Sequence, residues 1–134
     1  MTYIDKKKFN IYYEVYDPRI KSSLFEVDEF LAPIISILNK KGYKTEYCCS
    51  GHLNDVKLGD GFGTMPNNNC YILFKKNYDI LTIIPLGFEI ESNTNPMNKS
   101  ITIRKYYLQE NRFYEIIDTM KELYKWADSV PSRN

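Results

Sequence analysis

An apolar stripe near the C-terminus sets the strictest limit on how this chain can fold. Seven side chains recur at the i, i+3, i+4, i+7 spacing of an amphipathic helix: Phe113, Ile116, Ile117, Met120, Leu123, Tyr124 and Ala127. Such a helix has to bury its stripe against another layer of secondary structure. Asn111 suits the N-cap, Pro131 ends the helix, and we expect residues 130–134 to form a frayed tail.

A second helix is predicted at residues 28–41, where apolar side chains again recur at helical spacing. Pro33 clashes with a helix interior, so either the helix starts near Ala32 or its first turn is distorted. Gly42 follows the last apolar residue and suits the position just beyond a helix C-terminus.

The remaining apolar segments are short and predict strands. Alternating or β-branched and aromatic patterns occupy residues 9–16, 43–49, 70–75, 88–92 and 100–107. The last two are expected to pair as a hairpin around Asn95-Pro96, while residues 78–84 predict a short helix or turn. We therefore expect one α+β domain over residues 1–134: a single, mainly antiparallel sheet of about five strands with two main helices packed on one face.

Composition excludes several classes of protein. Eighteen basic and 17 acidic residues leave a net charge of +1, so strong non-specific binding to nucleic acid is not expected and any such contact needs a local patch. No apolar run approaches the ~18 residues of a transmembrane helix, and the N-terminus lacks the pattern of a signal peptide. Three cysteines, an odd number, argue against a disulfide framework. These features predict a cytoplasmic protein without a membrane partner.

The densest chemistry lies at residues 47–52, Tyr-Cys-Cys-Ser-Gly-His, which include the only histidine. This run ends a predicted strand and leads into a long polar stretch, residues 50–69, that holds four of the six glycines. Strand ends that lead into loops are common ligand sites in α/β proteins.

Two catalytic or metal interpretations compete at this run. A zinc site would use Cys48, Cys49, His52 and Cys70, but adjacent cysteines on one strand point to opposite faces. We therefore assign no metal ligand. A nucleophilic or acid–base site would pair His52 with Cys48 or Cys49, with Asp55 orienting the imidazole.

The third interpretation is a ligand-binding turn. Ser50 and Gly51 can present backbone N–H groups and a hydroxyl to an anionic group, Cys49 precedes them, and His52 adds a donor. Arg104 and Tyr106, in a strand where basic and aromatic residues are interleaved, could hold a phosphate and stack a base. A plain strand-ending turn without a ligand is the alternative.

The run Gly42-Tyr43-Lys44-Thr45, followed by Tyr47-Cys48-Cys49-Ser50-Gly51-His52, resembles small uncharacterised proteins of Firmicutes and their phages. More distantly it is similar to the wybutosine-synthesising tRNA methyltransferase family, in which a strand ends in Ser-Cys-Ser/Ala-Gly-Arg. The resemblance covers residues 30–92 and implies a functional turn at Cys49, Ser50 and Gly51. It also implies S-adenosylmethionine as a cofactor, although His52 replaces the family's arginine and no separate methyl-donor motif is present.

Three functions follow from these patterns. The first is a phage-type protein that binds a nucleotide-like or other anionic small ligand at the turn, to counter a host defence. The second is an enzyme acting on RNA or nucleotides with His52 as acid or base. The third is an inhibitor that binds a host protein without a small ligand. An oligomer is compatible with all three.

Overall fold

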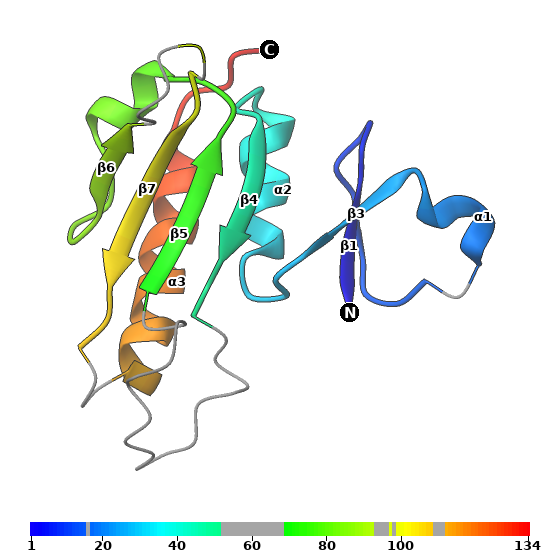
Figure 1. Ribbon diagram of the computed structural model, residues 1–134, viewed down its shortest axis with the longest axis horizontal. Helices are drawn as coiled ribbons and strands as arrows, with labels where there is room; N and C mark the ends of the chain where they lie inside the picture. Colours follow the sequence, from blue (N-terminus) through cyan, green and yellow to red (C-terminus); the bar gives the residue numbers. More distant parts are fainter. Residues whose placement is uncertain (16, 52–68, 93–96, 98, 109–111) are drawn as a thin grey trace.

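Figure 1 shows the computed structural model, which describes residues 1–15, 17–51, 69–92, 97, 99–108 and 112–134. The order of elements is β1 (Thr2–Asp5), β2 (Ile11–Tyr12), α1 (Pro18–Lys21), β3 (Leu24–Val27), α2 (Ala32–Lys40), β4 (Thr45–Cys49), β5 (Asn69–Phe74), the 3₁₀ helix η2 (Asp79–Thr82), β6 (Glu89–Ser92), β7 (Ile101–Tyr106) and α3 (Arg112–Ser129). None of the helices in these described ranges is long and apolar enough to span a bilayer.

The strands form two antiparallel sheets, so the expected single sheet of about five strands is wrong. One sheet has three strands in the order β2-β1-β3, and the other has four in the order β4-β5-β7-β6. The predicted hairpin is confirmed, because β6 pairs antiparallel with β7. The α+β class is also confirmed.

The three-stranded sheet was missed because its central strand, β1, was not predicted. Thr2, Tyr3 and Ile4 are buried, but Asp5 and three lysines follow them and hide this short segment in the sequence. Asp5 closes the following turn by accepting the backbone N–H groups of Lys7 and Phe9 at 3.1 and 2.9 Å. The strand predicted at residues 9–16 is consequently only the short β2, which pairs with β1.

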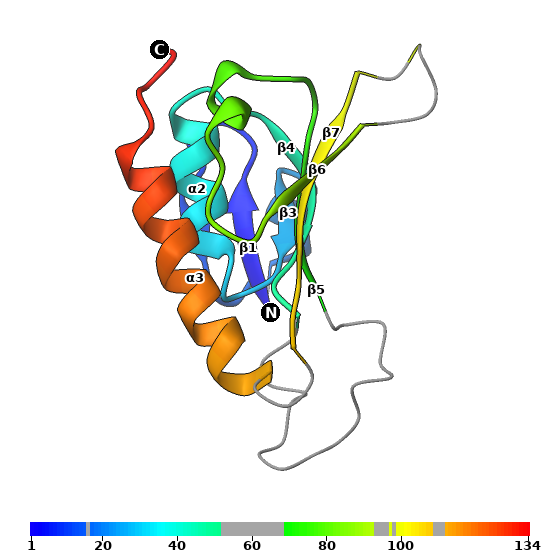
Figure 2. The same ribbon diagram turned by 90° about the vertical axis from the view of Figure 1, so that its left-hand side faces the viewer.

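Helices α2 and α3 lie on the same side of the four-stranded sheet (Figure 2), as expected for the two main helices. Helix α2 also contacts β1 and β2, so it lies between the two sheets. One continuous hydrophobic cluster joins all of these layers, with members that include Ile4, Val27, Leu38, Ile72 and Leu123. The two sheets therefore share one core.

The other side of the four-stranded sheet faces away from α2 and α3, and we call it the outer face (Figures 1 and 2). Alternation along the strands and the cross-strand register place ten side chains on it: Tyr47, Cys49, Asn69, Tyr71, Leu73, Glu89, Glu91, Thr102, Arg104 and Tyr106. No helix in the described part of the chain covers this face.

Both ends of α2 follow the local rules read from the sequence. The helix begins at Ala32, which confirms the first of the two alternatives and places Pro33 in the first turn, where a missing N–H costs nothing. At the other end Gly42 has φ = +96°. The N–H of Tyr43 donates to the Leu38 carbonyl at 2.9 Å, and that of Gly42 to the Asn39 carbonyl at 3.0 Å. This is the Schellman pattern that a glycine at this position favours.

The last residues do not fray, contrary to our expectation for residues 130–134. Val130 is buried, and the N–H of Arg133 donates to the Lys41 carbonyl at 2.7 Å. The Lys41 ammonium donates to the carbonyls of Ala127, Asp128 and Val130 at 2.7 to 2.8 Å. A cation bound to the carbonyls at the end of α3 also interacts favourably with the helix dipole, and this anchors the tail against α2.

Replacing Lys41 by Met is expected to lower the free energy of unfolding by about 2 kcal/mol, because several charge-assisted bonds at the end of α3 are lost. Urea denaturation followed by circular dichroism measures the change. Lys40→Met is the matched control, since it removes the same charge from the neighbouring, exposed position. Equal stability of the two variants would contradict the anchoring role of Lys41.

Candidate functional site

The outer face brings three of the predicted site residues together. Cys49 on β4 lies opposite Tyr71 on β5, and Tyr71 lies opposite Arg104 on β7. Tyr106 is two residues further along β7 than Arg104, so its side chain points to the same face. Cys49 is buried, Arg104 is half-buried, and the Tyr106 side chain is 59% exposed.

Arg104 is held in a fixed position on this face. Its Nε donates to Glu91 Oε1 at 2.9 Å and its Nη1 donates to Asn69 Oδ1 at 2.7 Å. Its guanidinium also lies over the Tyr71 ring, 4.9 Å from the centroid. The contact with Glu91 is an ion pair across the two strands β6 and β7. The guanidinium plane is therefore oriented before any ligand arrives.

Ser50 and Gly51 follow Cys49 at the end of β4, and Ser50 is fully buried. The Ser50 N–H and hydroxyl both donate to Asp28 Oδ2, at 2.9 and 2.6 Å, and its carbonyl accepts the Tyr107 hydroxyl at 2.5 Å. The Ser50 hydroxyl is thus engaged inside the protein and does not face the outer face. Gly51 has φ = +101°, a conformation that favours glycine.

Asp28 supports the turn after β4, and its sequence position gave no sign of this role. Besides Ser50, its carboxylate accepts the N–H of Phe30 at 3.0 Å, and its carbonyl accepts the N–H of Leu31 at 3.1 Å. One carboxylate therefore fixes both the start of α2 and the turn after β4. A contact between residues 28 and 50 leaves no local signal in the sequence.

The three thiols form no disulfide, and they are poor nucleophiles. The Cys48 side chain points toward the core, and the Cys49 side chain points to the outer face, because side chains alternate along a strand. Burial, together with the nearby charge of Asp28, raises the pKa of Cys48 to about 12. Burial also raises the pKa values of Cys49 and Cys70. A thiol that stays protonated at neutral pH reacts slowly, which disfavours Cys49 as a nucleophile.

Two of the predicted site residues, His52 and Asp55, lie outside the described residues, so their places relative to Cys49 are not described. Among the residues that the structure does describe, no three histidine, cysteine, aspartate or glutamate side chains gather closely enough to hold a metal ion.

The interleaved basic and aromatic residues of β7 do not share one face. Arg104 and Tyr106 lie on the outer face, while Lys105 and Tyr107 point toward the helices. The Lys105 ammonium donates to the Thr119 hydroxyl of α3 at 3.0 Å. Only Arg104 and Tyr106 are therefore accessible on the outer face, while Lys105 and Tyr107 pack on the core side.

Two further tyrosines on this face were not predicted as site residues. Tyr71 supports the Arg104 guanidinium, and Tyr47 on the edge strand β4 is 67% exposed. The alternation of Tyr71 with the buried residues Cys70 and Ile72 on β5 was visible in the sequence. The missing information was which strands lie side by side and which face lacks helices.

Comparison of the chain with protein-family models, with curated proteins and with solved structures found no match. The site described above is consequently argued from its own geometry, and the resemblance to the tRNA methyltransferase family, with its S-adenosylmethionine, stays a prediction.

Replacing Tyr107 by Phe is expected to lower the free energy of unfolding by about 1–3 kcal/mol, because the buried carbonyl of Ser50 loses its hydrogen-bond donor. Thermal and urea denaturation measure the change. Tyr106→Phe removes the same hydroxyl from the adjacent exposed ring and should change stability by less than about 0.5 kcal/mol. A similar effect of both substitutions would show that the bond to Ser50 does not hold the turn.

Stability should fall at alkaline pH in a way that depends on Cys48. Because burial raises the pKa of Cys48 from 9.0 to about 12, its stabilising contribution is complete below pH 9 and is lost as the pH rises toward 12. Between pH 9 and pH 10 the wild-type protein should therefore lose about 1 kcal/mol more than Cys48→Ala. Urea denaturation of both proteins at each pH tests this, and parallel pH profiles would contradict the burial of the thiol.

Proposed function

We propose that this protein binds a nucleotide-like, anionic ligand on the outer face, beside the turn formed by Cys49, Ser50 and Gly51. The observation that carries the proposal is the exposed Tyr106 ring next to the Arg104–Tyr71 pair, on a sheet face that no described helix covers. An exposed aromatic ring beside an oriented guanidinium is a combination suited to a flat base attached to a phosphate.

Each group has a stated part in binding. The base stacks on Tyr106, which is worth about 1–3 kcal/mol per base. A guanidinium has five N–H donors, and Glu91 and Asn69 account for two of the bonds that Arg104 makes with described residues. The remaining donors in the same plane bind the phosphate. Because Glu91 and Asn69 already fix the plane, little side-chain entropy is lost on binding.

Cys49 contributes a wall of the site in this proposal and not a reactive group. Its thiol is buried and its pKa is raised by burial, which supports a contact role over nucleophilic catalysis. Ser50 contributes by fixing the turn through Asp28, and Gly51 by adopting a backbone conformation that favours glycine. The wider role that we propose, countering a host defence, is supported by the resemblance of residues 42–52 to phage proteins.

Replacing Tyr106 by Ala is expected to weaken nucleotide binding about tenfold or more, since the stacking surface for the base is removed. Isothermal titration calorimetry with AMP, GMP, CMP and UMP measures the affinity of each for wild-type and variant proteins. Tyr124→Ala is the matched control, because Tyr124 is also exposed but lies on α3. Absence of binding by all four monophosphates, or equal loss in both variants, would contradict the proposal.

A further inference from the structure

A second feature lies at the edge of the outer face. A groove of about 670 Å³ runs between the two sheets, and its lining includes Lys6, Phe9, Phe25, Lys44, Tyr47 and Lys75. This volume lies within the range of about 300–1,000 Å³ that is usual for ligand sites. The groove combines aromatic rings, which stack on bases, with ammonium groups, which bind backbone phosphates.

The groove and the outer face share one residue, Tyr47. Its side chain belongs to the edge strand β4, is 67% exposed, and lies on the outer face through its pairing with Leu73. It also lines the groove. The outer face therefore carries tyrosines from Tyr106 past Tyr71 to Tyr47, which lies at the groove.

The spacing of these rings exceeds the reach of one nucleotide. Tyr106 lies opposite Asn69 and Tyr47 lies opposite Leu73, so they differ by four residues along the strands and by two strands across the sheet. With strands about 4.8 Å apart and about 3.3 Å per residue, the two positions are about 16 Å apart. A base stacked on Tyr106 leaves Tyr47 free for another base of the same ligand.

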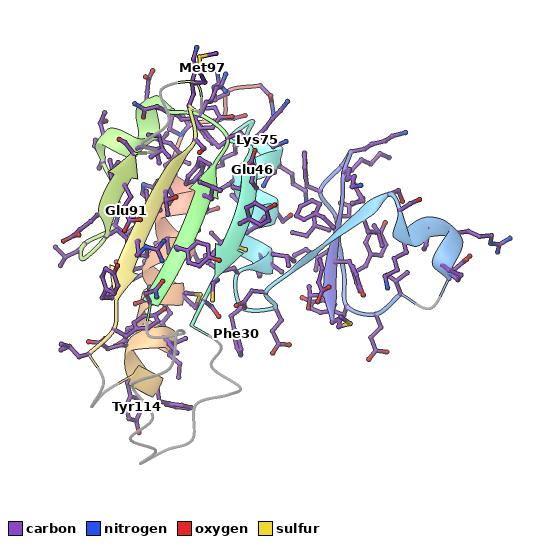
Figure 3. The ribbon with its side chains drawn as sticks, viewed as in Figure 1. Phe30, Glu46, Lys75, Glu91, Met97 and Tyr114 are labelled. Atoms are coloured by element: carbon purple, nitrogen blue, oxygen red, sulfur yellow. The ribbon has the colours of Figure 1, made fainter. Side chains whose placement is uncertain are left out.

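We infer that the ligand of this surface is a single-stranded nucleic acid, whose bases stack along the outer face and whose backbone enters the groove. This inference rests on the proposed function and specifies its ligand. The backbone phosphates meet Lys44 and Lys75, two exposed lysines that contribute to the same end of the groove (Figure 3 labels Lys75). Lys6 lies on the opposite rim, where its ammonium donates to the Ser22 carbonyl at 2.9 Å.

The acidic residues near the groove determine in which direction the nucleic-acid backbone runs, and they limit the strength of its binding. Glu26 and Glu46 also line the groove, so three ammonium groups face two carboxylates there. Glu91 on β6 is paired with Arg104, and Glu89 lies exposed on the same strand. The β6 edge is therefore unfavourable for phosphates, and the lysine-lined β4 edge is the favourable exit. Few phosphate contacts predict a moderate dependence of binding on salt.

Fluorescence anisotropy with labelled octamers tests the inference, using single-stranded RNA and DNA of the same mixed sequence and UMP as the mononucleotide competitor. We expect at least one octamer to bind ten times more tightly than UMP or better. The double variant Lys44→Gln, Lys75→Gln should weaken octamer binding about tenfold and reduce the salt slope by about 1.4, at about 0.7 per phosphate contact. The control Lys121→Gln, Lys125→Gln removes two exposed lysines from α3 and should change neither.

The outcomes separate this inference from the proposed function. Equal affinity for octamers and UMP, or binding of UMP alone, would overturn the inference and leave the proposed function standing. Octamer binding that the groove variant and its α3 control weaken equally would overturn the path through the groove. If neither octamers nor mononucleotides bind, both fail. Preference for RNA or for DNA identifies the natural ligand, and either preference supports the inference.

Discussion

The half-buried Asp28 carboxylate fixes the turn at the end of β4, beside which the outer face ends. It accepts both the N–H and the hydroxyl of Ser50, whose carbonyl in turn accepts the hydroxyl of Tyr107. These hydrogen bonds join three segments of the chain: the turn before α2, the end of β4 and the residue after β7. Removing one partner would leave buried polar groups unsatisfied, which costs about 1–3 kcal/mol for each group. Since Cys49 directly precedes Ser50, this link also fixes where the outer face ends.

Side chains alternate along each strand, so one side of the four-stranded sheet packs in the core and the other forms the outer face. On β7, Lys105 and Tyr107 bond to Thr119 and Ser50 on the core side, while Arg104 and Tyr106 lie on the outer face. Each side chain on the core side stabilises the same strand that presents Arg104 and Tyr106 on the other side. A shift of register by one residue would exchange the two sets, so the apolar core determines which groups reach a ligand.

The local features of the fold were predictable and the long-range ones were not. The pattern of α3, the start of α2 at Ala32 and the glycine that ends α2 all depend on neighbouring residues in the chain. Strand β1 was hidden because only Thr2, Tyr3 and Ile4 precede the three lysines. The sequence therefore predicted one sheet where the structure has two. Cys49, Arg104 and Tyr106, three of the residues predicted for the site, share a face. The contact of Asp28 with Ser50 and the place of Tyr47 on this face depend on segments that are far apart in the sequence.

The charge balance of the chain bears on how such a surface can recognise a polyanion. A net charge of +1 provides little long-range attraction, so discrimination has to come from short-range contacts. The two edges of the sheet differ in this respect: β6 carries Glu89 and Glu91, whereas in the groove beside β4 three lysines face two glutamates, Glu26 and Glu46. Carboxylates at one edge repel a phosphate backbone and ammonium groups at the other attract it. The tyrosines between them stack any base, because every base has a flat aromatic face. In the proposed complex, the charges would orient a strand on this sheet and the rings would stack its bases.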